Sequence, residues 1–204
     1  MPPARSAPAS PSRASADAGR PAQPVSGTGL SRDGISITTA RLTLVPSSLR
    51  WRDELFALFN DPDVADWLFL TGPPTREQLD RRIEAHTQFW AENGYGMFVA
   101  YETATGTLVA RVGAMLTPAT GRIEIAWSTT RAAWGQGYAT EATAAAIAFT
   151  FAHSTLETLD CYLRPDNTAS RRVAEKLGFR YRDTRYLYDR PLRFYQLARP
   201  SPRP

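Results

Sequence analysis

The stretch that most constrains the fold runs from Ile123 to Ala142 and reads IEIAWSTTRAAWGQGYATEA. Alternating apolar residues predict a β-strand at its beginning, and its alanine-rich end predicts an α-helix. Two glycines, Gly135 and Gly137, lie in the loop between them. Glycines let a backbone turn tightly and leave its N–H groups uncovered, and the first turn of a helix carries a partial positive charge. The stretch therefore predicts a strand–loop–helix unit that can bind phosphate or pyrophosphate.

Two known phosphate-binding motifs do not fit this loop. A Walker loop needs a lysine and a serine or threonine directly after its last glycine, whereas Tyr138 and Ala139 follow here. The dinucleotide-binding motif needs a third glycine within a parallel βαβ unit. A pair of glycines between a strand and a helix is not specific for any one ligand.

The rest of the chain alternates between strand and helix periodicities. Strands are predicted at Ile35–Val45, Gly96–Tyr101, Thr107–Met115, Gly121–Ser128, Leu156–Leu163, Phe179–Leu187 and Arg193–Ala198. Helices are predicted at Leu49–Phe59, from Thr75 to about Glu92, at Tyr138–His153 and at Asp166–Leu177, with a short helical turn at Asp63–Leu70. The order β-α-α-β-β-β-α-β-α-β-β indicates one α/β domain on a mixed sheet, with an antiparallel meander in its middle.

The chain of 204 residues divides into one domain and two tails. Residues 1–34 are rich in Pro, Ala, Ser and Arg and have no aromatic residue, so we expect disorder; a targeting peptide is the alternative. Residues 199–204 are expected to be a second disordered tail, which leaves residues 35–198 as the domain. Of 24 basic and 20 acidic residues, four arginines and two aspartates lie in residues 1–34 and two arginines in residues 199–204. The domain therefore has eighteen residues of each sign.

This balance excludes several classes of protein. A nucleic-acid-binding protein carries a basic face on its folded part, and this domain is neutral. No apolar stretch reaches the ~18 residues of a membrane span, and no secretory signal is recognised, so we expect a cytoplasmic protein with no membrane partner. The single Cys161 excludes an intramolecular disulfide, and with only His86 and His153 beside it we expect no metal site. We expect Cys161 and His86 to be packing residues.

A second informative stretch, Arg164–Phe179, reads RPDNTASRRVAEKLGF. Its apolar residues recur every four positions, as on the buried face of a helix, and Gly178 is the expected helix end. Judged from this segment, Asn167 is a helix cap and Ser170 a serine of the first turn.

The two stretches, in this order and about 30 residues apart, resemble the two signatures of the GNAT superfamily of N-acetyltransferases. The opening TTARLTLVP resembles the first strand of the RimJ/RimL-like branch. The resemblance covers roughly residues 35–198 and implies transfer of an acetyl group from acetyl-CoA to a primary amine, without a metal. A protein N-terminus is the leading acceptor, and a polyamine or an aminoglycoside is the alternative. A catalytically silent acyl-CoA-binding module is the alternative of another class.

The resemblance also implies which residues bind acetyl-CoA. The amides of Gly135–Ala139 would hold the pyrophosphate, and the pantetheine arm would lie as an added strand along the end of the preceding strand. Asn167 would hydrogen-bond the arm or the acetyl region, and Arg171 or Arg172 would bind the 3′-phosphate. The predicted binding residues are Ala126, Trp127, Ser128, Trp134, Gly135, Gln136, Gly137, Tyr138, Ala139, Thr140, Asn167 and Arg172.

Acetyl transfer to an amine requires a base for the amine, a donor for the oxyanion and an acid for the departing thiolate. Glu124, on the strand before the loop, is the predicted base, acting through water; a surface carboxylate is the alternative. A backbone N–H near Ala126–Trp127 would hold the oxyanion. Many members of the superfamily carry a tyrosine acid where Ala174 stands, so Ser170 is the predicted acid here, with a nearby tyrosine or water as the alternative.

The acceptor pocket is not encoded in a motif. Trp67, Phe69, Trp90 and Tyr186 are candidates for an apolar groove, and each is equally a candidate core residue. A homodimer formed through the last strands is a further possibility.

Overall fold

The computed structural model describes residues 34–69 and 71–201. The predictions for residues 1–33 and 202–204 lie outside the described residues. Arg199, in the segment predicted as a tail, donates hydrogen bonds from its guanidinium to the backbone oxygens of Phe151, Ser154 and Leu156 at 2.7–2.8 Å. The folded part of the chain therefore extends past Ala198.

Strands and helices follow the predicted order, with two differences discussed below. The strands are β1 (Ile37–Thr38), β2 (Leu42–Pro46), β3 (Met97–Glu102), β4 (Leu108–Thr117), β5 (Arg122–Thr129), β6 (Thr158–Leu163), β7 (Arg180–Leu187) and β8 (Arg190–Ala198). The helices are η1 (Leu49–Trp51), α1 (Arg52–Asn60), α2 (Pro62–Leu68), α3 (Arg76–Asn93), η2 (Arg131–Ala133), α4 (Tyr138–Ala152) and α5 (Thr168–Lys176). Within the described ranges, none of these helices combines the length and the apolar character that crossing a membrane requires.

The eight strands form one mixed sheet in the order β1-β2-β3-β4-β5-β6-β8-β7. All neighbours are antiparallel except β5 and β6, which are parallel and meet at a single pair, Glu124 opposite Asp160. Beyond that pair the two strands part, whereas β5 stays paired with β4 as far as Thr129. The predicted mixed sheet is confirmed, and it opens along one edge of β5.

The first predicted strand is wrong in one respect, because Ile35–Val45 forms two short strands and not one. The strands β1 and β2 are antiparallel, with Ile37 opposite Leu44. In the turn between them the Thr39 hydroxyl accepts a hydrogen bond from the Leu42 N–H at 3.0 Å. Threonine side chains offer the backbone such local bonds in place of a continuous ladder, and this favours the turn.

The predicted helical turn after α1 is a complete helix, α2. It begins with Pro62, and the Asp61 side chain accepts a hydrogen bond from the Asp63 N–H at 3.0 Å. Proline is favoured at the first helical position, and aspartate before it caps the free N–H groups. The predicted start of α3 is confirmed, since Thr75 forms a capping box with Gln78.

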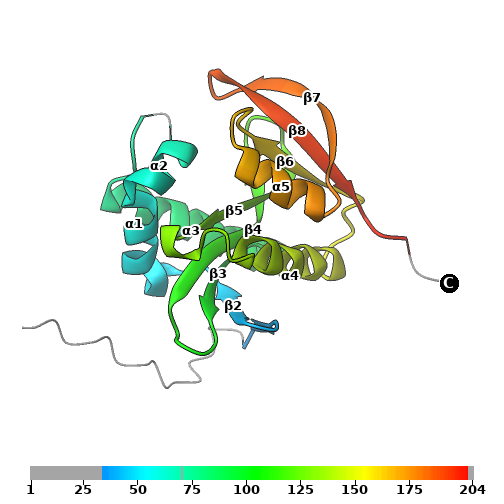
Figure 1. Ribbon diagram of the computed structural model, residues 1–204. Coiled ribbons are helices and arrows are strands. Elements are labelled where there is room, and N and C mark those ends of the chain that lie inside the picture. Colours follow the sequence, from blue (N-terminus) through cyan, green and yellow to red (C-terminus); the bar gives the residue numbers. More distant parts are fainter. Residues whose placement is uncertain (1–33, 70, 202–204) are drawn as a thin grey trace, which may run out of the picture.

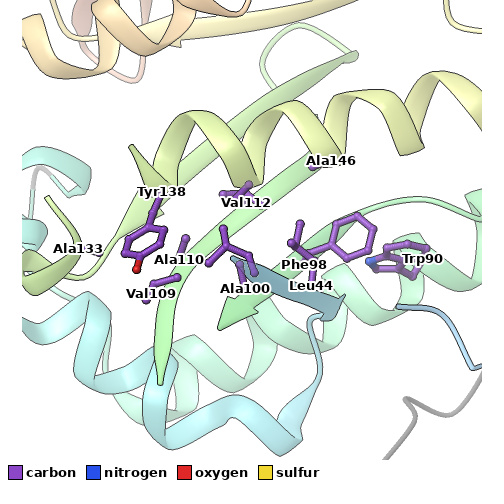
Figure 2. Packing of buried hydrophobic residues seen from close by; sticks show 12 residues of the cluster. Leu44, Trp90, Phe98, Ala100, Val109, Ala110, Val112, Ala133, Tyr138 and Ala146 are labelled. Carbon is purple, nitrogen blue, oxygen red and sulfur yellow. The ribbon is translucent and has the colours of Figure 1, made fainter. Parts of the chain in front are cut away.

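Helices cover both faces of the sheet. Successive strand residues point to opposite faces, so Phe98 packs in the cluster beneath α4 while Val99 packs in the cluster beneath α1 and α3. Figure 2 shows the cluster beneath α4, which runs from Tyr138 at the start of the helix to Phe98 and Trp90. Figure 1 shows α1 and α2 on one side of the molecule and α5 with β6, β7 and β8 on the other.

Candidate active site

A cleft of about 560 Å³ lies between the end of β5 and the residues that follow β6. Its walls come from α2, β5, the glycine loop, the first turn of α4, and α5. The lining residues are Val64, Trp67, Leu68, Trp127, Ser128, Thr129, Ala133, Trp134, Gly135, Gly137, Ala139, Thr140, Asp166, Asn167, Thr168, Ala169, Ser170, Arg172, Val173 and Lys176. One cleft therefore contains parts of both sequence stretches that carry the resemblance.

The glycine loop leaves the start of α4 open to this cleft. Gly135 and Gly137 have φ angles of 75° and 82°, in the left-handed region where side chains are disfavoured. Gly137 is also the N-cap of α4, and no side chain of the described residues accepts a hydrogen bond there, whereas α2, α3 and α5 each begin with a capping side chain. The uncapped N–H groups and the helix dipole make this turn a site for an anion such as a phosphate group.

Arg41 holds the glycine loop from the β1–β2 turn. Its Nη1 donates to the carbonyl oxygen of Gln136 at 3.0 Å, and its Nε and backbone N–H donate to the Glu141 carboxylate at 2.8 and 2.9 Å. The guanidinium lies 4.3 Å from the ring centroid of Tyr138, whose hydroxyl donates to Glu102 at 2.5 Å. Sequence reasoning missed Arg41, because no local pattern joins it to a loop about 95 positions later.

The structure brings most of the predicted binding residues together. Of the twelve, all of which lie in the described part of the chain, Ala126, Gln136 and Tyr138 do not line the cleft. The other nine do: Trp127, Ser128, Trp134, Gly135, Gly137, Ala139, Thr140, Asn167 and Arg172. The Tyr138 side chain belongs to the core, so it is also placed away from any role as an acid.

Helix α5 supplies a cap, a hydroxyl and two cations. The Asn167 side-chain oxygen accepts a hydrogen bond from the Ser170 N–H at 2.9 Å, so Asn167 is a helix cap. The half-buried Ser170 lines the cleft, and its hydroxyl has no hydrogen-bond partner in the described ranges. Arg172 lines the cleft and Arg171 does not; Lys176, one turn after Arg172, lines it too. The i, i+4 spacing of these two cations is the signal that sequence reasoning missed.

Glu124 is half-buried and is not a surface carboxylate. Its Oε2 accepts a hydrogen bond from the Thr117 hydroxyl at 2.7 Å. Burial raises the pKa of Glu124, and the Thr117 hydrogen bond and the charge of Arg111 oppose that rise. Glu124 lies at the pair where β5 and β6 meet and does not line the cleft itself. Ser128, four residues later on the same strand, does line it. A carboxylate with a raised pKa on a strand that leads to a cleft is suited to accept a proton through water.

The remaining candidates have packing roles or lie apart. Cys161 is buried, and burial raises the pKa of its thiol well above the usual range, which disfavours a reactive thiolate. Trp90 is buried and donates to the Met97 carbonyl, whereas Trp67 lines the cleft and Tyr186 is exposed. No group of three or more metal-ligating side chains occurs in residues 34–69 and 71–201.

Known proteins resemble this chain in sequence and in fold. The family model of the acetyltransferase (GNAT) domain matches residues 41–180. The uncharacterized protein YkkB of Bacillus subtilis is 30% identical over 165 residues, which cover 78% of this chain and 94% of the relative.

Two solved structures share the fold at identities too low to show more than the fold. One is an acetyltransferase of Salmonella typhimurium that modifies the N-terminal serine of ribosomal protein L7/L12; it is 15% identical with a TM-score of 0.66, over 79% of this chain and 97% of that one. The other is the aminoglycoside acetyltransferase AAC(6')-Ib in complex with coenzyme A, 16% identical with a TM-score of 0.65, over 78% and 95%. The family match, the mixed sheet and the open glycine loop agree: this chain belongs to the GNAT family of acetyltransferases and is an acetyl-CoA-dependent N-acetyltransferase.

Proposed function

We propose that this enzyme acetylates the α-amine of a protein N-terminus in the cytoplasm, with acetyl-CoA bound in the cleft between β5 and α5. The observation that carries the proposal is that one cleft joins the uncapped start of α4, the open edge of β5 and the first turn of α5. The choice of acceptor is supported by the resemblance of the opening TTARLTLVP to the RimJ/RimL-like branch and by the fold shared with the Salmonella enzyme. Acetyl-CoA is an intracellular metabolite, which supports the proposed location of the enzyme in the cytoplasm.

The cleft fits a long ligand that carries phosphate groups. The backbone from Gly135 to Thr140 offers N–H groups for a pyrophosphate. Past Glu124 the outer edge of β5 pairs with no other strand of the described residues, so its backbone N–H and C=O groups can pair with an extended amide-containing arm. Arg172 and Lys176 are placed for a further phosphate, and Asn167 for the arm.

The chemistry divides between two side chains. Acetyl-CoA supplies an acetyl group activated as a thioester, and its transfer to an amine releases the CoA thiol. Glu124 takes up the proton that the ammonium form of the acceptor must lose, through a water molecule. The Ser170 hydroxyl, which has no competing partner in the described ranges, donates a hydrogen bond to the leaving sulfur. The proton that the attacking nitrogen loses as the amide forms is passed through this hydroxyl to the sulfur, so that CoA leaves as the thiol and the serine ends protonated.

An aminoglycoside is the second candidate acceptor, supported by the fold shared with AAC(6')-Ib. Aminoglycosides are polycations, and binding sites for polycations need acidic side chains. The cation Arg111 acts electrostatically on Glu124, and Arg82 in turn acts on Arg111. These two arginines disfavour a polycationic acceptor at the proposed base.

A screen of acceptors tests the proposal. Peptides with free N-termini, spermidine and kanamycin are each supplied with acetyl-CoA, and release of the CoA thiol is followed. We expect peptides to give the highest kcat/KM, and mass spectrometry to place the acetyl group on the α-amine. Gly137→Asp serves as the control, since we expect this variant not to bind acetyl-CoA. Turnover of spermidine or kanamycin but not of peptides would contradict the proposed acceptor.

A further inference from the structure

Arg111 is a buried cation that makes no direct ion pair in the described residues, although the charge of Glu124 acts on it from the neighbouring strand. It lies on β4 with only 7% of its surface exposed. In residues 34–69 and 71–201, no carboxylate lies within ion-pair distance of its guanidinium. Buried charges in proteins are normally paired, because removing a cation from water is costly.

The side chain beside Arg111 does not neutralise it. Nη2 of Arg111 lies 3.1 Å from Nδ1 and 3.3 Å from Nε2 of His86. Burial and the charges of Arg111 and Arg82 lower the pKa of His86 to about 2, so the ring is neutral and has one acceptor nitrogen. The pKa of Arg111 is lowered to about 9, so Arg111 remains a cation at neutral pH.

Arg82 stands beside Arg111 on a shared aromatic pair. The guanidinium carbon of Arg111 lies 5.5 Å from the ring centroid of Phe59, and that of Arg82 lies 5.3 Å from the centroid of Phe69. The two rings meet edge to face at 5.7 Å. No ion pair of Arg82 occurs in the described ranges either. Two cations thus converge where packing favours flat guanidinium groups, and Glu124, which makes no direct ion pair with either, is the carboxylate whose charge acts on Arg111.

This cationic pair adjoins the cleft. Arg111 is the direct strand partner of Ser128, which lines the cleft. Val64 and Leu68 also line the cleft, and they pack in the same cluster as Phe59 and Phe69. The nitrogens Nε and Nη1 of Arg111 are not among the fully buried atoms that lack a partner, so each keeps a small accessible surface.

A purely structural role does not account for Arg111. A buried charge that has lost its partner is destabilising, and an apolar residue of similar volume is as stable or more stable in such a place. We propose that Arg111, assisted by Arg82, binds a carboxylate of the acceptor, so that preferred acceptors carry an acidic group close to the amine that is acetylated. The inference rests on the proposed function for the amine, and it selects protein N-termini with an acidic side chain next to the first residue.

Binding of matched products tests the anion site without relying on turnover. The full-length protein, saturated with CoA, is titrated calorimetrically with N-acetylated peptides that begin Ser-Glu or Ser-Gln and are otherwise identical. We expect the acidic peptide to bind about tenfold tighter, the effect of one partly desolvated ion pair. Equal affinities, including no binding of either peptide, would overturn the proposal.

Variants separate charge from structure. Arg111→Met should reduce the ratio of the two affinities to about one, and Arg111→Lys should restore part of it, because lysine keeps the charge and loses the flat fork. Arg82→Gln should lower the ratio to an intermediate value and covers the case in which Arg111→Met does not fold. Arg81→Gln, on the same helix, is the matched control and should change nothing. A loss that is equal for both peptides would show a structural role.

Turnover distinguishes this inference from the proposed function. The unacetylated peptides are compared with serine and serinamide, which differ in the α-carboxylate. A higher kcat/KM for the Ser-Glu peptide than for the Ser-Gln peptide supports both proposals. A preference seen only for serine over serinamide would support the anion site but contradict the protein N-terminus as acceptor, because the bound carboxylate would then be that of a free amino acid. Acetylation of both peptides at equal rates would remove the anion site and leave the N-terminal acceptor in place. Tight binding of the acidic product without peptide turnover would support the anion site and contradict the N-terminal acceptor.

Discussion

The guanidinium of Arg41 and the carboxylate of Glu141 form an ion pair that joins the β1–β2 turn to the first turn of α4. Nε and Nη2 of Arg41 lie 2.8 and 2.7 Å from the same oxygen, Oε2. Glu141 by itself would place a negative charge one turn from the N–H groups that we assign to the pyrophosphate. Arg41 neutralises that charge and fixes the Gln136 carbonyl by a hydrogen bond.

Removing Arg41 should therefore weaken acetyl-CoA binding. Arg41→Met leaves Glu141 uncompensated near a phosphate site, so we expect a Kd about tenfold higher, with a larger effect at low ionic strength. The double variant Arg41→Met with Glu141→Gln should recover most of the affinity, because the repelling charge is gone. Calorimetric titration of the wild type, of Arg41→Met, of Glu141→Gln and of the double variant measures this coupling. Additive losses in the double variant would show that the pair has only a structural role.

The rate of acetyl transfer should follow the protonation state of Glu124. A protonated carboxyl cannot accept the amine proton, and burial raises the pKa of this group. The rate should therefore be lost as the pH falls through the raised pKa. Glu124→Gln should lower the single-turnover rate by about 10²–10⁴-fold and remove this acid limb.

Thr117→Val supplies the matched control for Glu124. It removes the hydrogen bond that stabilises the charged carboxylate, so the acid limb should move to higher pH without disappearing. Unchanged pH profiles in both variants would assign the base elsewhere.

Much of the fold could be predicted because it depends on local patterns. The capping box of Thr75, the helix end at Gly178 and the glycine loop before α4 all appear in the sequence as short-range signals. The division of Ile35–Val45 into two strands was not predictable, because it depends on how the Thr39 side chain bonds in its turn.

The parts of the site that sequence reasoning missed are contacts between distant segments. Arg41 reaches Gln136 and Glu141 across 95 and 100 positions, and periodicity carries no information at that range. The burial of Arg111 likewise results from packing between β4, α1 and α3. The sequence pattern located the cleft, whereas tertiary packing determines the charges around it.

Ser170 and Asn167 should differ in what their loss affects. If Ser170 is the acid, Ser170→Ala should leave acetyl-CoA affinity near that of the wild type and lower the single-turnover rate by about 10²-fold, the low end for acid catalysis, because a thiolate is a fair leaving group. Asn167→Ala should weaken acetyl-CoA binding and also cost about 0.5–2 kcal/mol of stability, since it removes a helix cap. Full turnover in Ser170→Ala would assign the acid to water or another group.

The decisive measurement is the thermal stability of the wild type and of Gly137→Asp with and without acetyl-CoA. A ligand that binds only the folded state raises the melting temperature. Asp at position 137 places a side chain and a negative charge where Gly137, with its φ of 82°, presents bare backbone to the cleft. We predict a clear upward shift for the wild type in excess acetyl-CoA and none for Gly137→Asp, even where that variant folds. No shift for the wild type, or the same shift for both proteins, would contradict the assignment of this cleft to acetyl-CoA.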